Sequence, residues 1–207
     1  MATLVQRIRL WMLDKQKRKL HTAIKKGDAR KVGRILHLAK EKKELVPTAL
    51  AIEDGAYFAS DSVLEASFLD ALLQTYHKMP PLHWAARDGN KEIVETILHV
   101  GSATVHARNT LRQTPLHLAA FFGHKDLCAW LLDNGAKINS KADGDATPLH
   151  GAAQKGHRDV VELLISKSAD LQARDADGKT ALDWARRAEQ DETASLLAAH
   201  MSNTENT

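Results

Sequence analysis

The sequence predicts an all-α solenoid, in which stacked helix-turn-helix units are joined by extended, hairpin-like turns. The first observation is a repeat: Thr-Pro-Leu-His at residues 114–117 recurs 33 residues later at 147–150, and Thr-Ala-Leu-Asp follows after another 33 at 180–183. An upstream copy, Pro-Pro-Leu-His, stands at residues 80–83. The second observation is a glycine seven residues after Leu82, Leu116 and Leu149, at Gly89, Gly123 and Gly156. Self-similarity at a period of this length is the signature of a stacked repeat architecture.

Each unit opens with a short helix. Thr114 suits a helix start because its hydroxyl can cap the first turn, and Pro115 fits the first helical position. Leu116 and the alanines at 119–120 form one apolar face at i, i+3 and i+4, and the small alanines permit close packing against a neighbouring helix. Gly123 ends this helix, since a positive φ angle costs glycine little.

A second helix and a turn complete the unit. Leu127, Leu131 and Leu132 give the second helix its own apolar face, and Gly135 is expected to end it. Residues 141–145, Lys-Ala-Asp-Gly-Asp, are typical of a turn. The predicted unit is therefore a helix, a tight turn, a second helix and an extended turn.

This order of elements closely resembles the ankyrin repeat family over residues 80–199. The predicted units are residues 80–112, 113–145, 146–178 and a capping repeat at 179–199, with one extra residue near 101–103 that lengthens the first step to 34. Ser168 stands where glycine is usual. The last unit has Glu189 where the glycine of Gly-His would fall, and terminal repeats are expected to be atypical because one face meets water.

The N-terminal part is assigned by weaker patterns. Residues 1–16 are predicted to form a basic amphipathic helix, and residues 17–44 a divergent repeat, because the spacing from Leu20 to Gly27 and onward copies that of the later units. Residues 45–78 are either a degenerate repeat, which we favour, or a helical insertion, with a capping box at Ser62 and Glu65. Residues 200–207 are predicted to be a disordered tail, which gives five to six repeats in all.

Composition and charge exclude several classes. The 207 residues are 43% hydrophobic and 27% charged, which is globular, and no stretch reaches the ~20 apolar residues of a membrane span. One cysteine rules out an internal disulfide and favours a reducing compartment. Residues 1–44 hold 14 basic and 4 acidic residues, a net +10, whereas residues 45–207 hold 15 and 22, a net −7.

The eleven histidines raise the question of catalysis or metal binding. His83, His117 and His150 occupy the same position in successive repeats, so helices that pack ~8–10 Å apart keep them too far apart to share one metal. The family resemblance implies a structural role for them in the turn network, and the same holds for His124 and His157. Cys128 is predicted to be a small core hydrophobe. We therefore expect no enzymatic activity, no catalytic residue, no cofactor and no metal.

The resemblance implies protein binding through the turn tips and the concave face formed by the first helices. A Phe-Phe pair at 121–122, between the paired alanines and the glycine, is unusual there and can bury ~300–500 Å² against a partner. The alternative is that one phenylalanine packs within the stack. Trp84 and Trp184 either extend an aromatic band or fill gaps beneath their repeats, with Arg87 and Arg187 stacked on them. The predicted partner-binding residues are Phe121, Phe122, Trp84, Arg87, Asp88, Leu111, Arg112, Lys155, Trp184 and Arg187.

Two further features carry predictions. Asn109, Leu111 and Arg112 are among the turn-tip candidates, and Leu111 is expected to be an exposed apolar tip. The spacing of Asn139 after Leu131 resembles the sites that an asparaginyl hydroxylase modifies in ankyrin repeats. We favour a structural role, in which its side chain stabilises the turn.

The basic N-terminal segment has several interpretations. Its basic patch consists of Arg7, Arg9, Lys15, Lys17, Arg18 and Lys19. It could contact an anionic membrane peripherally, serve nuclear import, touch nucleic acid or bind an acidic partner. It could also cap the first repeat, with Trp11 and Met12 covering the open apolar face. Nucleic acid is disfavoured as the main ligand because the body is acidic.

Taken together, the sequence predicts a non-catalytic protein-protein interaction module that acts as an adaptor, inhibitor or scaffold. The alternative is a membrane- or nucleus-directed regulatory or effector protein whose basic helix sets its location. A cytoplasmic or nuclear monomer is expected, with a protein partner whose identity the sequence does not give.

Overall fold

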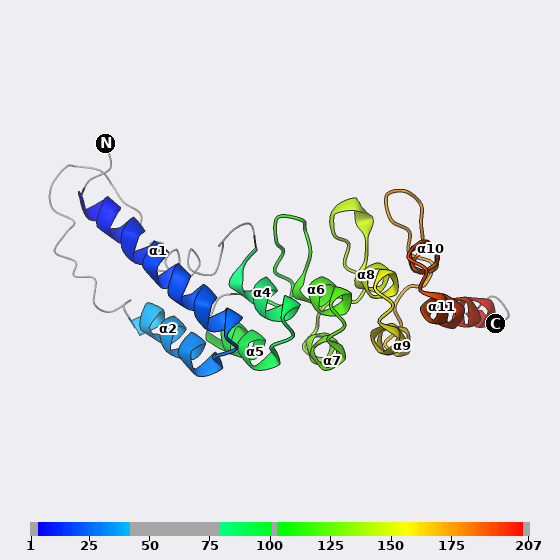
Figure 1. Cartoon of the computed structure of the whole chain (residues 1–207), viewed down its shortest axis with the longest axis horizontal. Coiled ribbons are helices and arrows are strands. Elements are labelled where there is room, and N and C mark those ends of the chain that lie inside the picture. The colour runs from blue at the N-terminus through cyan, green and yellow to red at the C-terminus, as the bar shows by residue number, and fades with distance from the viewer. Residues whose placement is uncertain (1–3, 42–78, 101–102, 205–207) are drawn as a thin grey trace. The chain divides into compact units, whose positions relative to one another are not determined.

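The computed structural model describes residues 4–41, 79–100 and 103–204, and the elements within these ranges are helices without strands (Figure 1). The all-α fold class is therefore confirmed. The chain divides into two units, residues 1–84 with 92–103 and residues 85–91 with 104–207. Each unit is described by itself. The degenerate repeat or insertion predicted at 45–78, with its capping box, lies outside the described residues.

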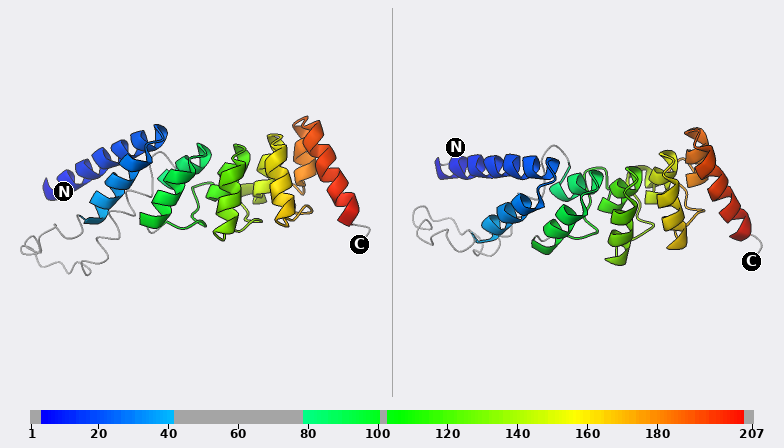
Figure 2. Two further views of the ribbon diagram at one scale, coloured as in Figure 1. Left: turned by 90° about the horizontal axis from the view of Figure 1, so that it is seen from below. Right: turned by 60° about the horizontal axis from the view of Figure 1, so that its bottom comes forward.

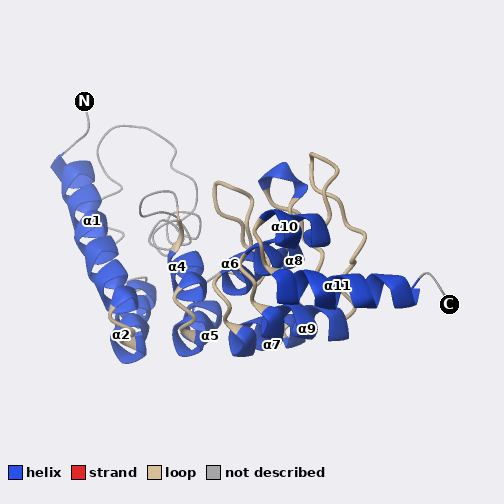
Figure 3. Cartoon of the chain, turned by 45° about the vertical axis from the view of Figure 1, so that its right-hand side comes forward, coloured by secondary structure: helices blue, strands red, loops and turns tan. Residues whose placement is uncertain are grey.

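The second unit contains three helix-turn-helix pairs. They are α6 (Pro115–Phe121) with α7 (Lys125–Asp133), α8 (Pro148–Gln154) with α9 (Arg158–Ser166), and α10 (Ala181–Arg187) with α11 (Asp191–Thr204). The first helices form one row and the second helices another (Figures 1 and 2). Figure 3 shows the long loops projecting beside the first helices. These pairs confirm the predicted helix-turn-helix units.

A capping box starts each first helix of this unit. The backbone N–H of Thr114 donates to Nδ1 of His117 at 3.1 Å, and the Thr114 hydroxyl lies 2.9 Å from the same nitrogen. Thr147 and His150 repeat this arrangement at 3.2 and 2.9 Å. Asp183 replaces the histidine in the last pair, where its carboxylate accepts from the N–H and the hydroxyl of Thr180. The predicted helix starts are thus explained by reciprocal side-chain and backbone bonds.

Residues with positive φ end the helices as predicted. Gly123 and Gly135 have φ angles of +79° and +86°, a conformation that costs glycine little. Ser168 occupies the position of Gly135 one repeat later at φ +64°, and Glu189 occupies that of Gly123 two repeats later at +57°. The backbone shape of the unit is therefore kept where the sequence departs from glycine.

The core of the second unit lies between the helix rows. Ala119 and Ala120 of α6 and the corresponding alanines of α8 are fully buried, which allows the first helices to stack closely. Leucines of the second helices, such as Leu131 and Leu164, close the core from the other side. Burial of these alanine and leucine side chains supplies most of the stability of such a stack.

The first unit contains α1 (Leu4–Lys25), α2 (Ala29–Glu41), the start of α4 (Pro81–Arg87) and most of α5 (Lys91–Val100). The turn between α1 and α2 contains Gly27 at φ +68°, so the helix-turn-helix predicted within 17–44 is present. The predicted boundary between residues 16 and 17 is wrong, because one helix of 22 residues crosses it. No glycine or proline interrupts residues 4–25, so nothing in the sequence stops the helix there.

The C-terminal tail also differs from the prediction. Helix α11 continues to Thr204, so residues 200–204 are helical instead of disordered. The Ser202 hydroxyl donates back to the carbonyl of Ala198 at 3.1 Å, and the segment has no helix-breaking residue. Residues 205–207 lie outside the described range.

Candidate protein-binding face

Four pairs of residues follow the buried alanines at the ends of α4, α6, α8 and α10. We call them the helix-end row: Arg87, Asp88, Phe121, Phe122, Gln154, Lys155, Arg187 and Ala188. All eight belong to the second unit, and all are exposed or half-buried. They are held at equivalent places by the repeat, yet the stack does not need their side chains for its core. The row is therefore a candidate binding surface.

The two phenylalanines have different environments. Their rings meet edge to face with centroids 5.1 Å apart. Phe121 is half-buried and packs on α8 at Gly151, where a Cβ added to the glycine would lie 3.4 Å from its ring. Phe122 is 41% exposed. The alternative considered from the sequence thus holds for Phe121, while Phe122 presents its ring to solvent.

A cation covers each phenylalanine from a neighbouring repeat. The Arg87 guanidinium lies 5.5 Å from the Phe122 ring centroid, and the Lys155 ammonium lies 4.8 Å from that of Phe121. Both distances fit cation–π attraction. Arg87, Phe122, Phe121 and Lys155 thus form a continuous ladder across three repeats. Sequence reasoning missed these pairs because they depend on how one repeat lies on the next.

Histidines at the starts of the second helices fix the backbone beneath the row. His124 Nε2 donates to the carbonyl of Arg87 at 2.7 Å, and His157 Nε2 donates to that of Phe121 at 3.0 Å. Each bond joins the start of a second helix to the end of the first helix one repeat earlier, α7 to α4 and α9 to α6. His117 and His150 likewise donate from Nε2 to the next hairpin, at Ala146 and Lys179. For these four histidines the predicted structural role is confirmed.

Trp184 contacts side chains of the preceding repeat, residues 146–178. Its ring meets His150 edge to face at 5.3 Å, and its Nε1 donates to the Asp175 carboxylate at 2.7 Å. Partial burial works to raise the pKa of Asp175, but hydrogen bonds from Lys179 N–H, Trp184 Nε1 and Asp177 N–H hold it below its usual value. Trp184 therefore stabilises the hairpin tip, a role that neither interpretation of the sequence included.

A hollow of about 650 Å³ adjoins the row. It is lined by Trp184, by the exposed Arg186 and Arg187 at the end of α10, and by Asp177 of the hairpin tip. Three members of the row, Gln154, Arg187 and Ala188, are among the residues that line it. The hollow is large enough for part of a peptide, and its lining carries both signs of charge.

The hairpin tips are linked to one another. The N–H of Asp143 donates to the carbonyl of Leu111 in the tip one repeat earlier. In the same way, the N–H of Ala176 donates to the carbonyl of Gly144 one repeat earlier. Leu111 is 55% exposed, as predicted, and Arg112 is exposed beside it. Asn109, another predicted tip, is instead buried, because its Oδ1 accepts from the N–H of Leu111 and of Gln113 and so shapes the turn.

Asn139 and Cys128 have structural surroundings. Asn139 is exposed and its Oδ1 accepts from the N–H of Asp170 at 3.0 Å, which fits the structural role favoured above. Cys128 is fully buried, and burial, followed by the charge of Asp159, raises the pKa of its thiol to about 12. It is thus a core hydrophobe without thiolate character. Within the described residues, no cluster of three or more His, Cys, Asp or Glu side chains could hold a metal ion.

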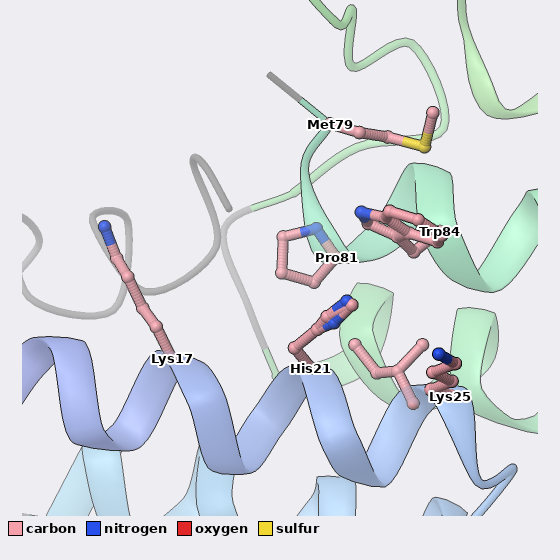
Figure 4. Close-up of a pocket in the computed structure, with 7 residues that line it drawn as sticks. Lys17, His21, Lys25, Met79, Pro81 and Trp84 are labelled. Carbon is pink, nitrogen blue, oxygen red and sulfur yellow. The ribbon is translucent and has the colours of Figure 1, made fainter. Parts of the chain in front are cut away.

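In the first unit, Trp84 packs against α1. Figure 4 shows His21 pointing from α1 toward Pro81 and Trp84, and the His21 and Trp84 rings lie 5.0 Å apart. Lys17 and Lys25 flank a hollow of only about 10 Å³, room for about one water molecule. This hollow is too small for an organic ligand.

The basic patch lies on α1. Lys15, Arg18 and Lys19 are exposed, while Leu20 is buried against the rest of the unit. Lys17 is half-buried. Arg7 and Arg9 fall within α1, but their side chains, like those of the predicted cap residues, lie outside the described part. None of the described helices is both long enough and apolar enough to cross a bilayer.

Comparison with known proteins agrees with this architecture. A family model of three ankyrin repeats matches residues 20–142 and again 139–207. The chain belongs to the ankyrin-repeat family. Ankyrin repeats indicate a protein-protein interaction module, and the family is generally non-enzymatic.

Individual relatives match parts of this ankyrin-repeat chain. Rabankyrin-5 of Homo sapiens is 30% identical over 138 residues, which are 60% of this chain and 11% of that protein. Alpha-latrocrustotoxin-Lt1a of Latrodectus tredecimguttatus is 39% identical over 64 residues, which are 31% of this chain and 4% of the toxin. The transient receptor potential cation channel subfamily A member 1 of Homo sapiens is 39% identical over 66 residues, which are 28% of this chain and 6% of the channel subunit. The chain thus spans only a small share of these relatives.

Proposed function

We propose that the chain is a non-catalytic adaptor, inhibitor or scaffold that holds a protein partner through its helix-end row. The observation that carries the proposal is Phe122, a phenylalanine 41% exposed at the centre of an ordered row and flanked by Arg87. Large side chains with polar neighbours are typical anchors of protein interfaces. Leu111 and Arg112 at the adjoining hairpin tip are proposed to contribute to specificity.

The support for this face is its rigidity. The hydrogen bonds from His124 and His157 to the carbonyls of Arg87 and Phe121 hold the backbone of the row. The Phe121 ring packs against Gly151, where the absence of a side chain leaves room for it. A surface that is ordered before binding loses little conformational entropy on docking, so more of the contact energy appears as affinity. The same face is the part of the second unit where side chains are least needed for the core.

The test is partner capture with matched variants. Native lysate is passed over the intact protein, a Phe122→Glu variant and a Leu38→Glu variant, each verified by circular dichroism and thermal melting. Both substitutions place a charge at an exposed large apolar residue, and Leu38 lies on α2, outside the row and the hairpin tips. A partner retained by the intact protein and by Leu38→Glu, but lost with Phe122→Glu, supports the row. A partner retained equally by all three contradicts it.

A second function is favoured by the exposed basic residues of α1. Lys15, Arg18 and Lys19 lie within one helical turn or so, and exposed Arg30 and Arg34 add charge on α2. We propose that this basic face directs the protein to an anionic membrane surface or to the nucleus, and that the protein is otherwise a cytoplasmic monomer. Basic helical surfaces gain affinity from anionic lipids and lose it with salt.

Charge reversal separates this role from a purely structural one. In Lys15→Glu/Arg18→Glu/Lys19→Glu, the altered side chains are exposed, so the helix and its buried Leu20 remain. A fluorescent fusion of this variant is expected to lose the location of the parent protein, and sedimentation with phosphatidylserine vesicles is expected to fall. Unchanged location and unchanged sedimentation would leave α1 as a cap for the repeats.

A further inference from the structure

The helix-end row is more basic than the rest of the unit that carries it. The second unit, residues 85–91 and 104–207, holds 14 basic and 15 acidic residues, yet the row has three cations, Arg87, Lys155 and Arg187, against one anion, Asp88. Two of the cations lie on the phenylalanine rings. Apolar surface and positive charge therefore coincide at one place on a nearly neutral unit, which steers negatively charged partners to that place.

From this coincidence we infer that the row binds an acidic segment of a partner protein that carries an apolar side chain between carboxylates. The inference rests on the proposed function and names the chemistry of the partner. The apolar side chain packs on the exposed Phe122, and the carboxylates pair with Arg87 and Lys155.

The stacking geometry suits carboxylates. A guanidinium on an aromatic ring uses its planar face, whereas a carboxylate binds its N–H edge, so the two interactions are compatible on one arginine. The ring also restricts the cation before binding, which lowers the entropy lost when the ion pair forms. A lysine ammonium presents three donors and can likewise serve a ring and an acceptor together.

The ladder also sets the spacing of the partner's charges. The two cations are joined through contacts of 5.5, 5.1 and 4.8 Å, from Arg87 to Phe122, to Phe121 and to Lys155. This path sets an upper limit on the separation of the two cations. The first and fifth residues of a strand, four steps of ~3.3 Å apart, lie close enough for their side chains to reach both. The expected pattern is an acidic residue, a central apolar residue, and a second acidic residue about four positions after the first.

The neighbouring hollow defines where this segment ends. Asp175, Asp177 and Asp183 line it together with Arg186 and Arg187, so its field is mixed. Carboxylates of the hairpin tip repel an acidic segment there. Binding is therefore centred between Arg87 and Lys155, where Asp88 is the one acidic member of the row.

The test uses defined peptides with the full chain. A fluorescent peptide with three copies of Glu-Ser-Leu-Ser-Glu is titrated in low salt and followed by fluorescence anisotropy. Matched peptides carry Lys for Glu, or Ser for Leu. We expect the acidic leucine peptide to bind roughly tenfold or more tightly than either matched peptide, because it alone satisfies both the charges and Phe122.

Variants of the protein locate the binding. Arg87→Glu/Lys155→Glu is expected to weaken the acidic peptide roughly tenfold or more. Lys125→Glu/Lys137→Glu makes the same change in net charge at exposed lysines outside the row and is expected to change affinity less than about twofold. Melting curves verify that both variants fold.

Three results would overturn the inference: equal losses in the two variants, equal binding of the lysine peptide, or no saturation by about 1 mM peptide. These outcomes are distinct from failure of the proposed function. A captured partner that Phe122→Glu releases, but that Arg87→Glu/Lys155→Glu still binds, leaves the row as the interface and removes only its acidic specificity.

Discussion

Gly123, at the end of α6, offers a quantitative test of how the helix-end row is held. It has a φ angle of +79°, and a Cβ added there would lie 2.7 Å from Nδ1 of His157. That histidine donates from Nε2 to the carbonyl of Phe121 at 3.0 Å. Gly135 is the matched control, because its φ is +86° and a Cβ added there meets nothing within 4 Å. The perturbation is alanine at either position.

Both substitutions force alanine into the left-handed region, which costs about 1–2 kcal/mol of unfolding free energy. Ser168 at φ +64°, in the place of Gly135 one repeat later, shows that this backbone accepts a side chain. Gly123→Ala must in addition displace the His157 ring and lose its hydrogen bond, at about 0.5–1.5 kcal/mol for the bond alone. We therefore expect Gly135→Ala to cost ~1–2 kcal/mol and Gly123→Ala ~2–4 kcal/mol.

Urea denaturation followed by circular dichroism measures both costs, with equal m-values as the condition for comparing them. A double-mutant cycle with His157→Ala then assigns the difference. In that background no ring blocks the new methyl group, so Gly123→Ala should cost no more than Gly135→Ala. Equal costs for the two glycine variants in the parent protein, or an extra cost of Gly123→Ala that persists without His157, would refute the role of the histidine.

Three further predictions concern other side chains of the second unit. Burial lowers the pKa of His150 below 6.5 in the folded protein. As pH falls, this histidine is therefore protonated in the unfolded chain before it is protonated in the folded protein. Stability should therefore decline below about pH 6.5, and less so in His150→Gln, as measured by urea midpoints at several pH values. Cys128 should react with a thiol reagent at pH 8 only as fast as the repeats open, and rapidly in denaturant; fast reaction of the native protein would contradict its burial. Asp175→Ala removes the acceptor of Trp184 Nε1 and should cost about 1–3 kcal/mol, whereas an unchanged melting temperature would show that the tip is held otherwise.

The repeat architecture was predictable because its determinants are local. Thr114, Pro115 and His117 form a capping box within four residues, and Gly123 permits a turn that few other residues favour. Such short-range features recur at a fixed period, so one sequence suffices to detect them. The helical tail after residue 200 is not evident from the sequence because a polar terminus is typical of disorder, although this segment contains no residue that breaks a helix.

The candidate site was predictable in part. The helix-end positions and the unusual phenylalanine pair follow from the repeat register. The stacking of Arg87 over Phe122 does not, since it joins residues 35 positions apart and depends on the offset between adjacent helices. The difference between the half-buried Phe121 and the exposed Phe122 also depends on Gly151 in the next repeat, a contact that helix periodicity within one repeat cannot reveal.

The central claim is that the helix-end row is the surface that binds the partner. Hydrogen exchange of the full chain, with and without a captured partner at saturation, tests it most directly. We expect added protection in peptides that contain residues 85–91, 119–124 and 152–157, with little change in α7 and α9. Protection confined to α7, α9 or α1, with the row unchanged, would contradict it.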